Sequence, residues 1–359
     1  MSLLKLSVNN LRNLKEVEIR PSPRFNLIVG PNASGKTSLL EAIYLLGFAK
    51  SFRTSNPKKI INHQQEELTV FGQIAQQSER VIPVAIRRNR KELQIKLDNR
   101  MLRKRSELSL TLPLQIINPE SHRILEQGPK FRRHYLDWGV FHVEHRFLQA
   151  WKDYFHILKQ RNAALRHFVA DGLVRAWDEG LIEKAGVINH YRCGYLQQLT
   201  PIFEKIGHEV FDLDTLSIEY RPGWPKEQNY SDALNLSLER DKASGYTHCG
   251  PHRSDIAIKI AGQPALEFAS RGQQKLIITA LKLAQVALLK ERSGKNCPVL
   301  VDDLASELDQ KNRAKLLQAL DNLGTQVFIT MTEQSLVDMD GIRDKKMFHV
   351  KQGTIQEVA

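Results

Sequence analysis

A glycine-rich loop near the N-terminus constrains the fold of this chain more than any other feature. Residues 30–37 form a complete GxxxxGKT phosphate-binding motif, and they follow the apolar run of residues 25–29 as such a loop follows a strand. In this motif backbone N–H groups face a β-phosphate, while Lys36 reaches the β and γ oxygens and Thr37 offers its hydroxyl to Mg²⁺ at a helix N-terminus. The sequence therefore predicts an α/β fold with a site for a nucleoside triphosphate. The predicted nucleotide-binding residues of the loop are Gly30, Pro31, Asn32, Ala33, Ser34, Gly35, Lys36 and Thr37.

Residues 297–303 supply the second half of such a site. This apolar, β-branched run ends in Asp302 and Asp303, as expected for a buried parallel strand that delivers acids to the metal edge of the site. We expect Asp302 to hold Mg²⁺, directly or through water, and Asp303 to polarise the attacking water, where many related ATPases carry Glu. A strand that merely ends in two aspartates at a turn is the alternative. The predicted catalytic residues are Lys36, Asp302 and Asp303, and the predicted metal ligands are Thr37 and Asp302.

More residues separate these two halves than a plain nucleotide-binding domain needs, so we expect an inserted domain. Residues 1–120 are predicted to form the first part of an ATPase head, with the phosphate-binding loop and a basic β-lobe. Residues 121–240 are predicted to form a mostly helical arm, and residues 241–359 the second part of the head. No heptad pattern lasts over the three or four repeats that a coiled coil needs, so the arm is not expected to be a long coiled coil.

Periodicity places the main helices of this arrangement. The apolar spacing of residues 141–169 and 177–211 predicts two helices in the arm. Residues 38–46 are expected to form the helix that follows the phosphate-binding loop, and Gly47 is expected to end it.

Residues 269–275 precede an apolar helix and resemble the signature motif of ABC-type ATPases. Ser270 is a candidate helix N-cap, and Gly272 leaves room for a close approach. In that superfamily the Ser and Gly grip the γ-phosphate of ATP bound to the other subunit, so the resemblance implies an ATP-dependent homodimer. The implied cofactor-binding residues here are Ser270, Gly272 and Gln273. Residues 306–309 resemble the D-loop of the same interface, and Thr330 occupies the switch position where transporters usually carry His.

Together with Leu11-Arg12-Asn13, these segments resemble the RecF family of bacterial recombination and gap-repair proteins, in the chromosome-maintenance branch of the ABC-type ATPases. The resemblance runs essentially end to end. Its most specific parts are residues 128–137 and 248–255, because neither belongs to the general ABC pattern. It implies ATP as the nucleotide, with Arg12 and Asn13 at the nucleotide phosphates. It also implies binding of duplex and gapped DNA, the mediators RecO and RecR as partners, loading of the recombinase RecA, and roles in replication-fork maintenance and the SOS response.

The chain departs from the wider ABC pattern at two positions. Arg271 stands where the first Gly of the common signature would be, and Asp303 stands where the catalytic Glu would be. Both are similar to what RecF proteins carry. Because a shorter acid reaches less far towards the water, we expect a weak, DNA-stimulated ATPase that acts as a switch and not as a motor.

The charge balance favours a polyanionic partner. The formal net charge is +12, and the excess of basic residues is concentrated between residues 50 and 133. Alternation in residues 68–74, 81–86 and 93–97 predicts antiparallel strands joined by polar turns that carry this charge. Such a lobe would contact duplex phosphates without reading sequence, although the same runs could be solvated turns. The candidate DNA-binding residues are Arg87, Arg88, Arg90, Lys91, Arg103, Lys104 and Arg105.

Other functional classes fit the sequence less well. A transporter ATPase subunit would share the nucleotide site but would lack the helical insert and the basic lobe, and a repair nuclease would need a second acidic metal cluster. A module in which ATP binding only sets assembly stays open, as does an ATPase of the chromosome-maintenance branch with another partner. Three isolated cysteines argue against a disulfide frame or a zinc site. Without a signal peptide or an apolar run of about 18 residues, we expect a cytoplasmic protein with no membrane partner.

Overall fold

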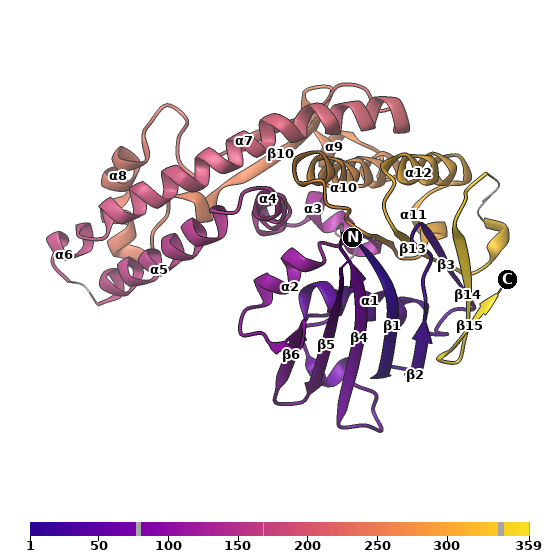
Figure 1. Ribbon diagram of the computed structural model, residues 1–359. Coiled ribbons are helices and arrows are strands. Elements are labelled where there is room, and N and C mark those ends of the chain that lie inside the picture. The colour runs from indigo at the N-terminus through magenta and orange to yellow at the C-terminus, as the bar shows by residue number, and fades with distance from the viewer. Residues whose placement is uncertain (77–79, 168, 337–340, 359) are drawn as a thin grey trace. The chain divides into compact units, whose positions relative to one another are not determined.

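The computed structural model describes residues 1–76, 80–167, 169–336 and 341–358. The chain forms two compact units (Figure 1): Met1–Ser121 with Leu281–Ala359, and His122–Ala280. The first boundary lies next to the predicted one at residue 120. The second lies at residue 280 and not at 240, because strand β10 (Asp255–Ile260) pairs along its whole length with β9 (Leu216–Arg221) and so belongs to the inserted unit.

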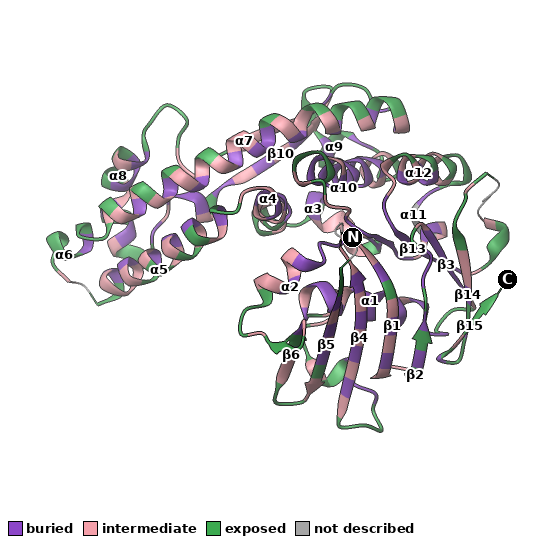
Figure 2. Ribbon diagram, in the orientation of Figure 1, coloured by how far each residue is buried: buried purple, intermediate pink, exposed green. Residues whose placement is uncertain are grey.

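The first unit contains an antiparallel sheet with the strand order β2-β1-β4-β5-β6-β7. Its strands are β1 (Ser2–Leu11), β2 (Leu14–Ile19), β4 (Glu67–Ala75), β5 (Val81–Asn89), β6 (Leu93–Leu97) and β7 (Arg100–Met101). Buried and partly exposed residues alternate along β4 and β5 (Figure 2). This is the period-2 pattern of a sheet with one face on the core, and it confirms the three antiparallel strands that the sequence predicted here.

A second sheet in this unit has the order β15-β14-β3-β13-β12-β8. Its strands are β3 (Phe25–Val29), β8 (Gln115–Ile117), β12 (Val299–Val301), β13 (Val327–Met331), β14 (Lys345–Lys351) and β15 (Thr354–Val358). All pairs are parallel except that of β14 with β15. Every residue of β3, β12 and β13 is buried, as expected for parallel strands covered on both faces.

Helix α1 (Lys36–Phe48) lies in the hydrophobic core that both sheets share. The prediction that Gly47 ends this helix was wrong. Gly47 is buried inside the helix, and the chain leaves the helix at Ala49, which has a φ of 48°. A Cβ on Gly47 would lie 2.7 Å from Leu114 Cδ1 and 2.8 Å from the carbonyl oxygen of Leu112. Glycine is therefore used here for close packing and not as a helix end.

The remaining helices of the first unit are α2 (Arg105–Thr111), α11 (Leu304–Glu307) and α12 (Gln310–Leu323), with short 3₁₀ turns at Pro57–Lys59, Pro119–His122 and Gln334–Leu336. Helix α10 (Arg271–Ser293) begins in the second unit and continues into the first. Of the helices described, none is both long and apolar enough to cross a membrane.

The second unit is mostly helical, as predicted. Its helices are α3 (Arg123–Glu126), α4 (Pro129–Val143), α5 (Phe147–Arg166), α6 (Asp171–Arg175), α7 (Asp178–Phe211), α8 (Tyr230–Ser244) and α9 (Ala265–Phe268). Strands β9, β10 and β11 (Gln263–Pro264) form a small antiparallel sheet. The predicted helix over residues 177–211 is confirmed by α7. The stretch 141–169 does not form one helix, because α4 ends at Val143 and α5 begins at Phe147.

Two buried arginines tie the helices of this unit together. Arg161 on α5 donates to Asp178 on α7 at 2.8 Å and to Asp241 on α8 at 2.7 Å. Arg192 on α7 donates from Nε to Asp137 on α4 at 2.9 Å. Removing one partner from such a buried pair costs about 3 to 5 kcal/mol, because the other charge then stays buried and unpaired. These pairs therefore fix the packing of α4, α5, α7 and α8.

The family-specific segment 248–255 has a packing role in this unit. Gly250 has a φ of 130°, and a Cβ there would lie 2.3 Å from the hydroxyl oxygen of Tyr154. His252 Nε2 lies 3.0 Å from the carbonyl oxygen of Thr247, which can only accept, so Nε2 carries the proton and Nδ1 accepts from the Tyr154 hydroxyl at 2.7 Å. Burial lowers the pKa of His252 to about 4, so the ring is neutral at pH 7.

Candidate nucleotide-binding site

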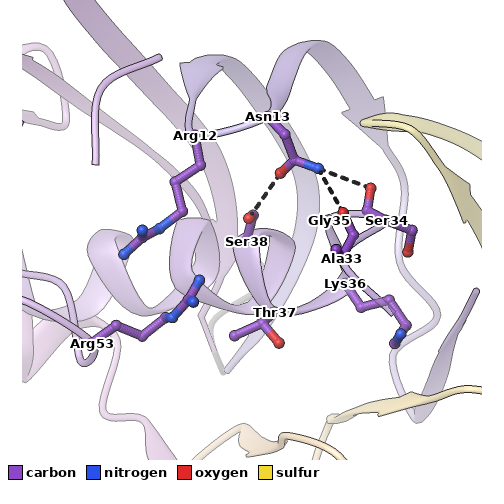
Figure 3. A pocket seen from close by; sticks show the side chains of 9 residues that line it. All are labelled: Arg12, Asn13, Ala33, Ser34, Gly35, Lys36, Thr37, Ser38 and Arg53. Carbon is purple, nitrogen blue, oxygen red and sulfur yellow. Dashed lines mark hydrogen bonds between the residues drawn. The ribbon is translucent and has the colours of Figure 1, made fainter. Parts of the chain in front are cut away.

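The loop between β3 and α1 borders a pocket of about 350 Å³ in the first unit (Figure 3). Its lining residues are Arg12, Asn13, Ala33, Ser34, Gly35, Lys36, Thr37, Ser38 and Arg53. The predicted loop residues Gly30, Pro31 and Asn32 precede these residues in the same loop and are not part of the lining.

The two motif glycines are required by the shape of the loop. Gly35 has a φ of 120°, a conformation that side chains rarely adopt, and it stands immediately before the first turn of α1. A Cβ on Gly30 would lie 2.2 Å from the carbonyl oxygen of Val350 on β14. The loop thus keeps its curvature only with glycine at both positions, which is what a backbone anion cradle needs.

The side chain of Lys36 folds back onto the phosphate-binding loop and bonds to its first residues. Its Nζ donates to the carbonyl oxygens of Gly30 at 2.7 Å and Pro31 at 2.9 Å. Burial lowers the pKa of Lys36, and the negative charges of Asp303 and Asp302 oppose that shift. The acidic pair is therefore close enough to Lys36 for electrostatic coupling, although Asp302 lies far away in sequence.

Strand order brings the two halves of the site together. In the parallel sheet β13 lies between β3, which leads into the loop, and β12, which leads into Asp302. The hydroxyl of Thr37 donates to Asp302 Oδ1 at 2.9 Å. These two predicted metal ligands thus lie side by side at the carboxyl edge of the sheet, where open α/β sheets place their ligands.

Thr330, at the end of β13, contacts both aspartates. Its hydroxyl donates to Asp302 Oδ1 at 2.9 Å and accepts the backbone N–H of Asp303 at 2.8 Å. Burial raises the pKa of Asp302, and the hydrogen bonds from Thr330 and Thr37 oppose that shift. The residue at the predicted switch position therefore supports the acidic pair directly.

Asp303 has an unusual backbone. Its φ is 54° and its ψ is 57°, in the left-handed region, and it stands directly before the short helix α11. Asp tolerates this region better than most residues, at a cost on the order of 1 kcal/mol. The chain therefore turns sharply just after Asp302. The backbone strain of this turn lies at Asp303, the residue predicted to polarise water.

A buried glutamate holds two arginines at the mouth of the pocket. Glu41 on α1 is fully buried, and the Nη2 of Arg12 donates to its Oε1 at 2.9 Å while Arg12 Nε pairs with its other oxygen. Arg53 Nη1 lies 3.9 Å from Glu41 Oε2, and the hydroxyl of Ser51 also donates to Glu41. Sequence reasoning missed Glu41 and Arg53. One signal was visible, because Glu41 is the single acid of α1 and interrupts the apolar run that follows Ser38.

Asn13 fastens the phosphate-binding loop to the turn between β1 and β2. Its Nδ2 donates to the carbonyl oxygen of Ser34 at 3.0 Å, and its Oδ1 accepts from the hydroxyl of Ser38 at 3.0 Å (Figure 3). Arg12, its neighbour, has a φ of 52°. One tight turn thus places both predicted phosphate-contacting side chains beside the loop, Asn13 through hydrogen bonds and Arg12 through Glu41.

The signature segment starts α10 with a reciprocal cap. The hydroxyl of Ser270 accepts the backbone N–H of Gln273 at 3.2 Å, and Gln273 Oε1 accepts the backbone N–H of Ser270 at 2.9 Å. This is a capping box, so the predicted N-cap role of Ser270 is confirmed. Gly272 is exposed, and a Cβ there would meet nothing closer than 3.9 Å. These residues belong to the second unit.

The predicted D-loop, residues 306–309, is described in part. Its first two residues end the backbone of α11, and their side chains lie outside the described residues. Asp309 caps α12, because its Oδ1 accepts the backbone N–H of Asn312 at 2.8 Å.

The predicted DNA-binding residues fall into two groups. Arg87 and Arg88 lie within β5 and not in a turn, and Arg87 donates to Glu67 on the neighbouring strand at 2.8 Å. Burial and the nearby Arg105 charge lower the pKa of Arg88. The other candidates are exposed, either in the turn after β5 or around the start of α2: Arg90, Lys91, Arg103, Lys104 and Arg105. Arg87 is exposed as well, but its guanidinium already pairs with Glu67, so a phosphate would have to compete with that carboxylate.

The chain matches the family described as RecF/RecN/SMC N terminal domain over residues 2–356. It is 46% identical over 366 residues to the DNA replication and repair protein RecF of Azotobacter vinelandii (strain DJ / ATCC BAA-1303), with 99% of each chain covered. It is 45% identical over 363 residues to the RecF of Stutzerimonas stutzeri (strain A1501), covering 100% of this chain and 98% of the relative.

Solved structures of similar fold agree with these sequence relatives. A structure of the recombination mediator protein RecF with ATP, in the RecFOR pathway, is similar with a TM-score of 0.89 and 29% identity, covering 100% of this chain and 98% of that one. A Smc head bound to the C-winged helix domain of ScpA is similar with a TM-score of 0.61 at 16% identity, covering 100% of this chain and 98% of that one, which is a likeness of fold alone. The predicted fold class, an ABC-type ATPase head with mixed sheets and an inserted, mostly helical arm, is confirmed.

Proposed function

The chain belongs to the RecF family, and on that basis we propose that it is an ATP-dependent DNA-binding protein of replication and recombinational repair. One observation carries the proposal. The hydroxyl of Thr37 donates a hydrogen bond to Asp302, although the two residues are far apart in sequence, and the ammonium group of Lys36 lies in the same loop as Thr37. This is the donor set that phosphoryl-transfer sites use for a triphosphate and its metal.

The residues present fit ATP and Mg²⁺. Two glycines, where a Cβ would crowd Val350 and Asn13, let the loop backbone curl beside a pocket of about 350 Å³. The hydroxyl of Thr37 and the carboxylate of Asp302 are hard oxygen donors, which Mg²⁺ prefers. Bound Mg²⁺ supplies positive charge that neutralises the phosphates.

Each side chain of the site then has a defined task. The loop N–H groups and Lys36 bind and orient the β- and γ-phosphates, and Arg12 adds positive charge at the phosphates from the turn that Asn13 fastens. Asp303 accepts a hydrogen bond from the attacking water and orients it towards the γ-phosphate. Because its side chain is one methylene shorter than Glu, turnover is slow, and we propose that DNA stimulates it.

Assembly follows from the signature segment. Ser270, Gly272 and Gln273 stand at the exposed start of α10, where an N-terminal helix end favours an anion. We propose that they bind the γ-phosphate of ATP held by a second copy of this chain, so that two ATP molecules close a homodimer around duplex DNA. The exposed basic residues of the first unit contact the phosphate backbone, at single-strand gaps, and the partners are the RecO and RecR mediators and the recombinase RecA. Through them the protein supports replication forks and the SOS response.

Sedimentation velocity of the purified protein tests this proposal. It is measured with ATP, with ADP and without nucleotide, each with and without a gapped duplex. A monomer that dimerises only with ATP, and binds duplex more tightly as it does, is the expected result. A monomer that ignores ATP would overturn the clamp, because the signature segment would then not act across subunits.

A further inference from the structure

Helix α5 of the second unit carries a regular row of cations that the nucleotide site does not use. Lys152, Lys159 and Arg166 are exposed and follow one another at intervals of seven residues. Seven residues turn a helix by about 20° less than two full turns, so the three side chains lie on one face. At 1.5 Å per residue they are spaced by about 10.5 Å and extend over about 21 Å.

The other positions of this face add no acid to it. Gln149 and His156 are exposed at the same helical spacing, and Ala163 is small. The only acid of α5, Asp153, accepts a hydrogen bond from Gln149 at 2.7 Å. Trp151 and Phe155 pack against each other with their ring centroids 4.2 Å apart and their ring planes tilted by 38°, and both are only partly exposed. The face therefore offers charge without an exposed aromatic surface.

These cations also differ from others of the same unit in having no acidic partner. Lys205 pairs with Glu209, Lys226 with Glu219, and Lys242 with Asp171 and Glu239. In the described part of the chain, no such ion pair involves Lys152, Lys159 or Arg166. Their charge is thus available to an anion that comes from outside the molecule.

We infer that this face of α5 is a second contact surface for duplex DNA, separate from the basic residues of the first unit. A polyanion with evenly spaced phosphates matches a straight row of evenly spaced cations, and neutralising phosphates releases counterions. Without exposed aromatic side chains the face cannot stack on unpaired bases, so it favours the duplex backbone over single strands and reads no sequence. The inference rests on the proposed DNA-binding function and names a part of the chain that carries it.

Salt dependence of binding to a fluorescent blunt duplex tests the inference. The full-length protein is titrated with ATP between about 50 and about 200 mM NaCl, and the slope of log K against log salt is compared among three proteins. The arm variant carries Lys152→Gln, Lys159→Gln and Arg166→Gln. The matched control carries Lys205→Gln, Lys226→Gln and Lys242→Gln, which changes the net charge of the same unit equally but removes cations that already have acidic partners. Thermal unfolding and ATP affinity are measured for all three.

The arm variant should lower the slope by about 2 to 3, since each lost phosphate contact contributes about 0.9, and should keep its ATP affinity. The control should keep most of the slope. Equal slopes for the wild type and the arm variant, or equal losses in both variants, would overturn the inference while leaving the proposed function intact. A wild type that does not bind duplex overturns both. If the arm variant keeps its duplex slope but loses binding to polyglutamate, the face serves an acidic polypeptide and the inference is wrong.

Discussion

Thr37 and Asp302 are 265 positions apart in the chain, and the hydroxyl of one donates to the carboxylate of the other at 2.9 Å. The strands that lead into these two residues, β3 and β12, are not neighbours in the sheet, because β13 lies between them. The contact exists because all three strands are parallel and end at the same edge. The nucleotide site is thus a product of sheet order, and substitutions on either side of the inserted unit should affect the same chemistry.

Lys36→Arg should leave ATP binding largely intact and lower hydrolysis at least about tenfold, a loss of about 1.4 kcal/mol of transition-state stabilisation. The planar guanidinium keeps the charge but cannot place it where the ammonium sits, held by two loop carbonyls. Fluorescent-nucleotide titration and phosphate release measure the two steps. Lys59→Arg, on an exposed turn, serves as control. Normal turnover in the Lys36 variant contradicts the role given to this residue.

Asn13→Ala should weaken ATP binding about tenfold, since it removes the hydrogen bonds with Ser34 and Ser38, worth about 0.5 to 1.5 kcal/mol each, from the loop. The fold should persist, because Asn13 lies in a surface turn. Asn9→Ala is a matched control, since that side chain on β1 bonds Thr69 at 3.2 Å and not the loop. Titration with ATP separates the two. Equal affinities for both variants would mean that Asn13 does not shape the loop.

Asp303→Asn should lower phosphate release about a hundredfold or more while ATP binding changes little, because the amide cannot polarise water as a carboxylate does. Asn tolerates a φ of 54° as well as Asp, so the turn after β12 should keep its shape. Unfolding temperatures that match the wild type check this. If turnover persists, a different group activates the water.

Two substitutions, Ser270→Ala and Ser270→Asp, should distinguish the role of Ser270 as a helix cap from its proposed contact with ATP on the other subunit. The Ala variant loses the bond to Gln273 and about 1 kcal/mol of stability, whereas Asp caps as well as Ser. Both should lose ATP-dependent dimerisation, the Asp variant through repulsion of the γ-phosphate. Thermal unfolding and sedimentation velocity report the two effects. An Asp variant that still dimerises with ATP would place the contact elsewhere.

Lys282 should make stability depend on alkaline pH. It is buried on α10, its Nζ donates to Gln115 Oε1 at 3.2 Å, and burial lowers its pKa from 10.5 to about 8. Between pH 8 and 10.5 the unfolded chain holds a proton that the folded chain has released, so stability rises with pH in this window. Below pH 8 the penalty, about 3 kcal/mol, is fully present.

Lys282→Met removes this titration. Denaturant unfolding of both proteins across the window should therefore show a difference that favours the variant below pH 8 and shrinks as the pH rises towards 10.5. A difference that does not change with pH would mean that the lysine is protonated throughout, and that the buried site accommodates its charge.

Local motifs were predictable to the extent that their chemistry depends on neighbours in sequence. The loop from Gly30 to Thr37, the acids after β12 and the capping residue Ser270 are all short-range patterns, and the structure places each in the expected kind of element. Parallel register then brings Thr37 and Asp302 together, which the sequence could suggest but not measure.

What escaped prediction depends on packing between distant segments. Glu41 stood out as the single acid of α1, but the sequence did not reveal the partner that compensates its buried charge, Arg12 on the turn between β1 and β2. Gly47 carried a helix-end signal, but contact with Leu112 and Leu114 decides its use. The boundary at residue 280 follows from the pairing of β9 with β10, which no local composition marks. Residues 144–146 separate α4 from α5 within the stretch 141–169, and the apolar periodicity of that stretch did not indicate this break.

The turn that carries Asn13 belongs to the antiparallel sheet, whereas the loop that it fastens extends from the parallel one. The loop is also held from its own sheet, because the N–H of Gly353, between β14 and β15, donates to the carbonyl oxygen of Ser34 at 2.9 Å, so Asn13 adds a second fastening from the other sheet. Amide protons near Ser34 and Ser38 should exchange with solvent at the rate at which the first hairpin opens, and a bound nucleotide should slow that exchange across the hairpin as well as in the loop. Opening of the N-terminal hairpin and nucleotide binding in the pocket should therefore be thermodynamically coupled.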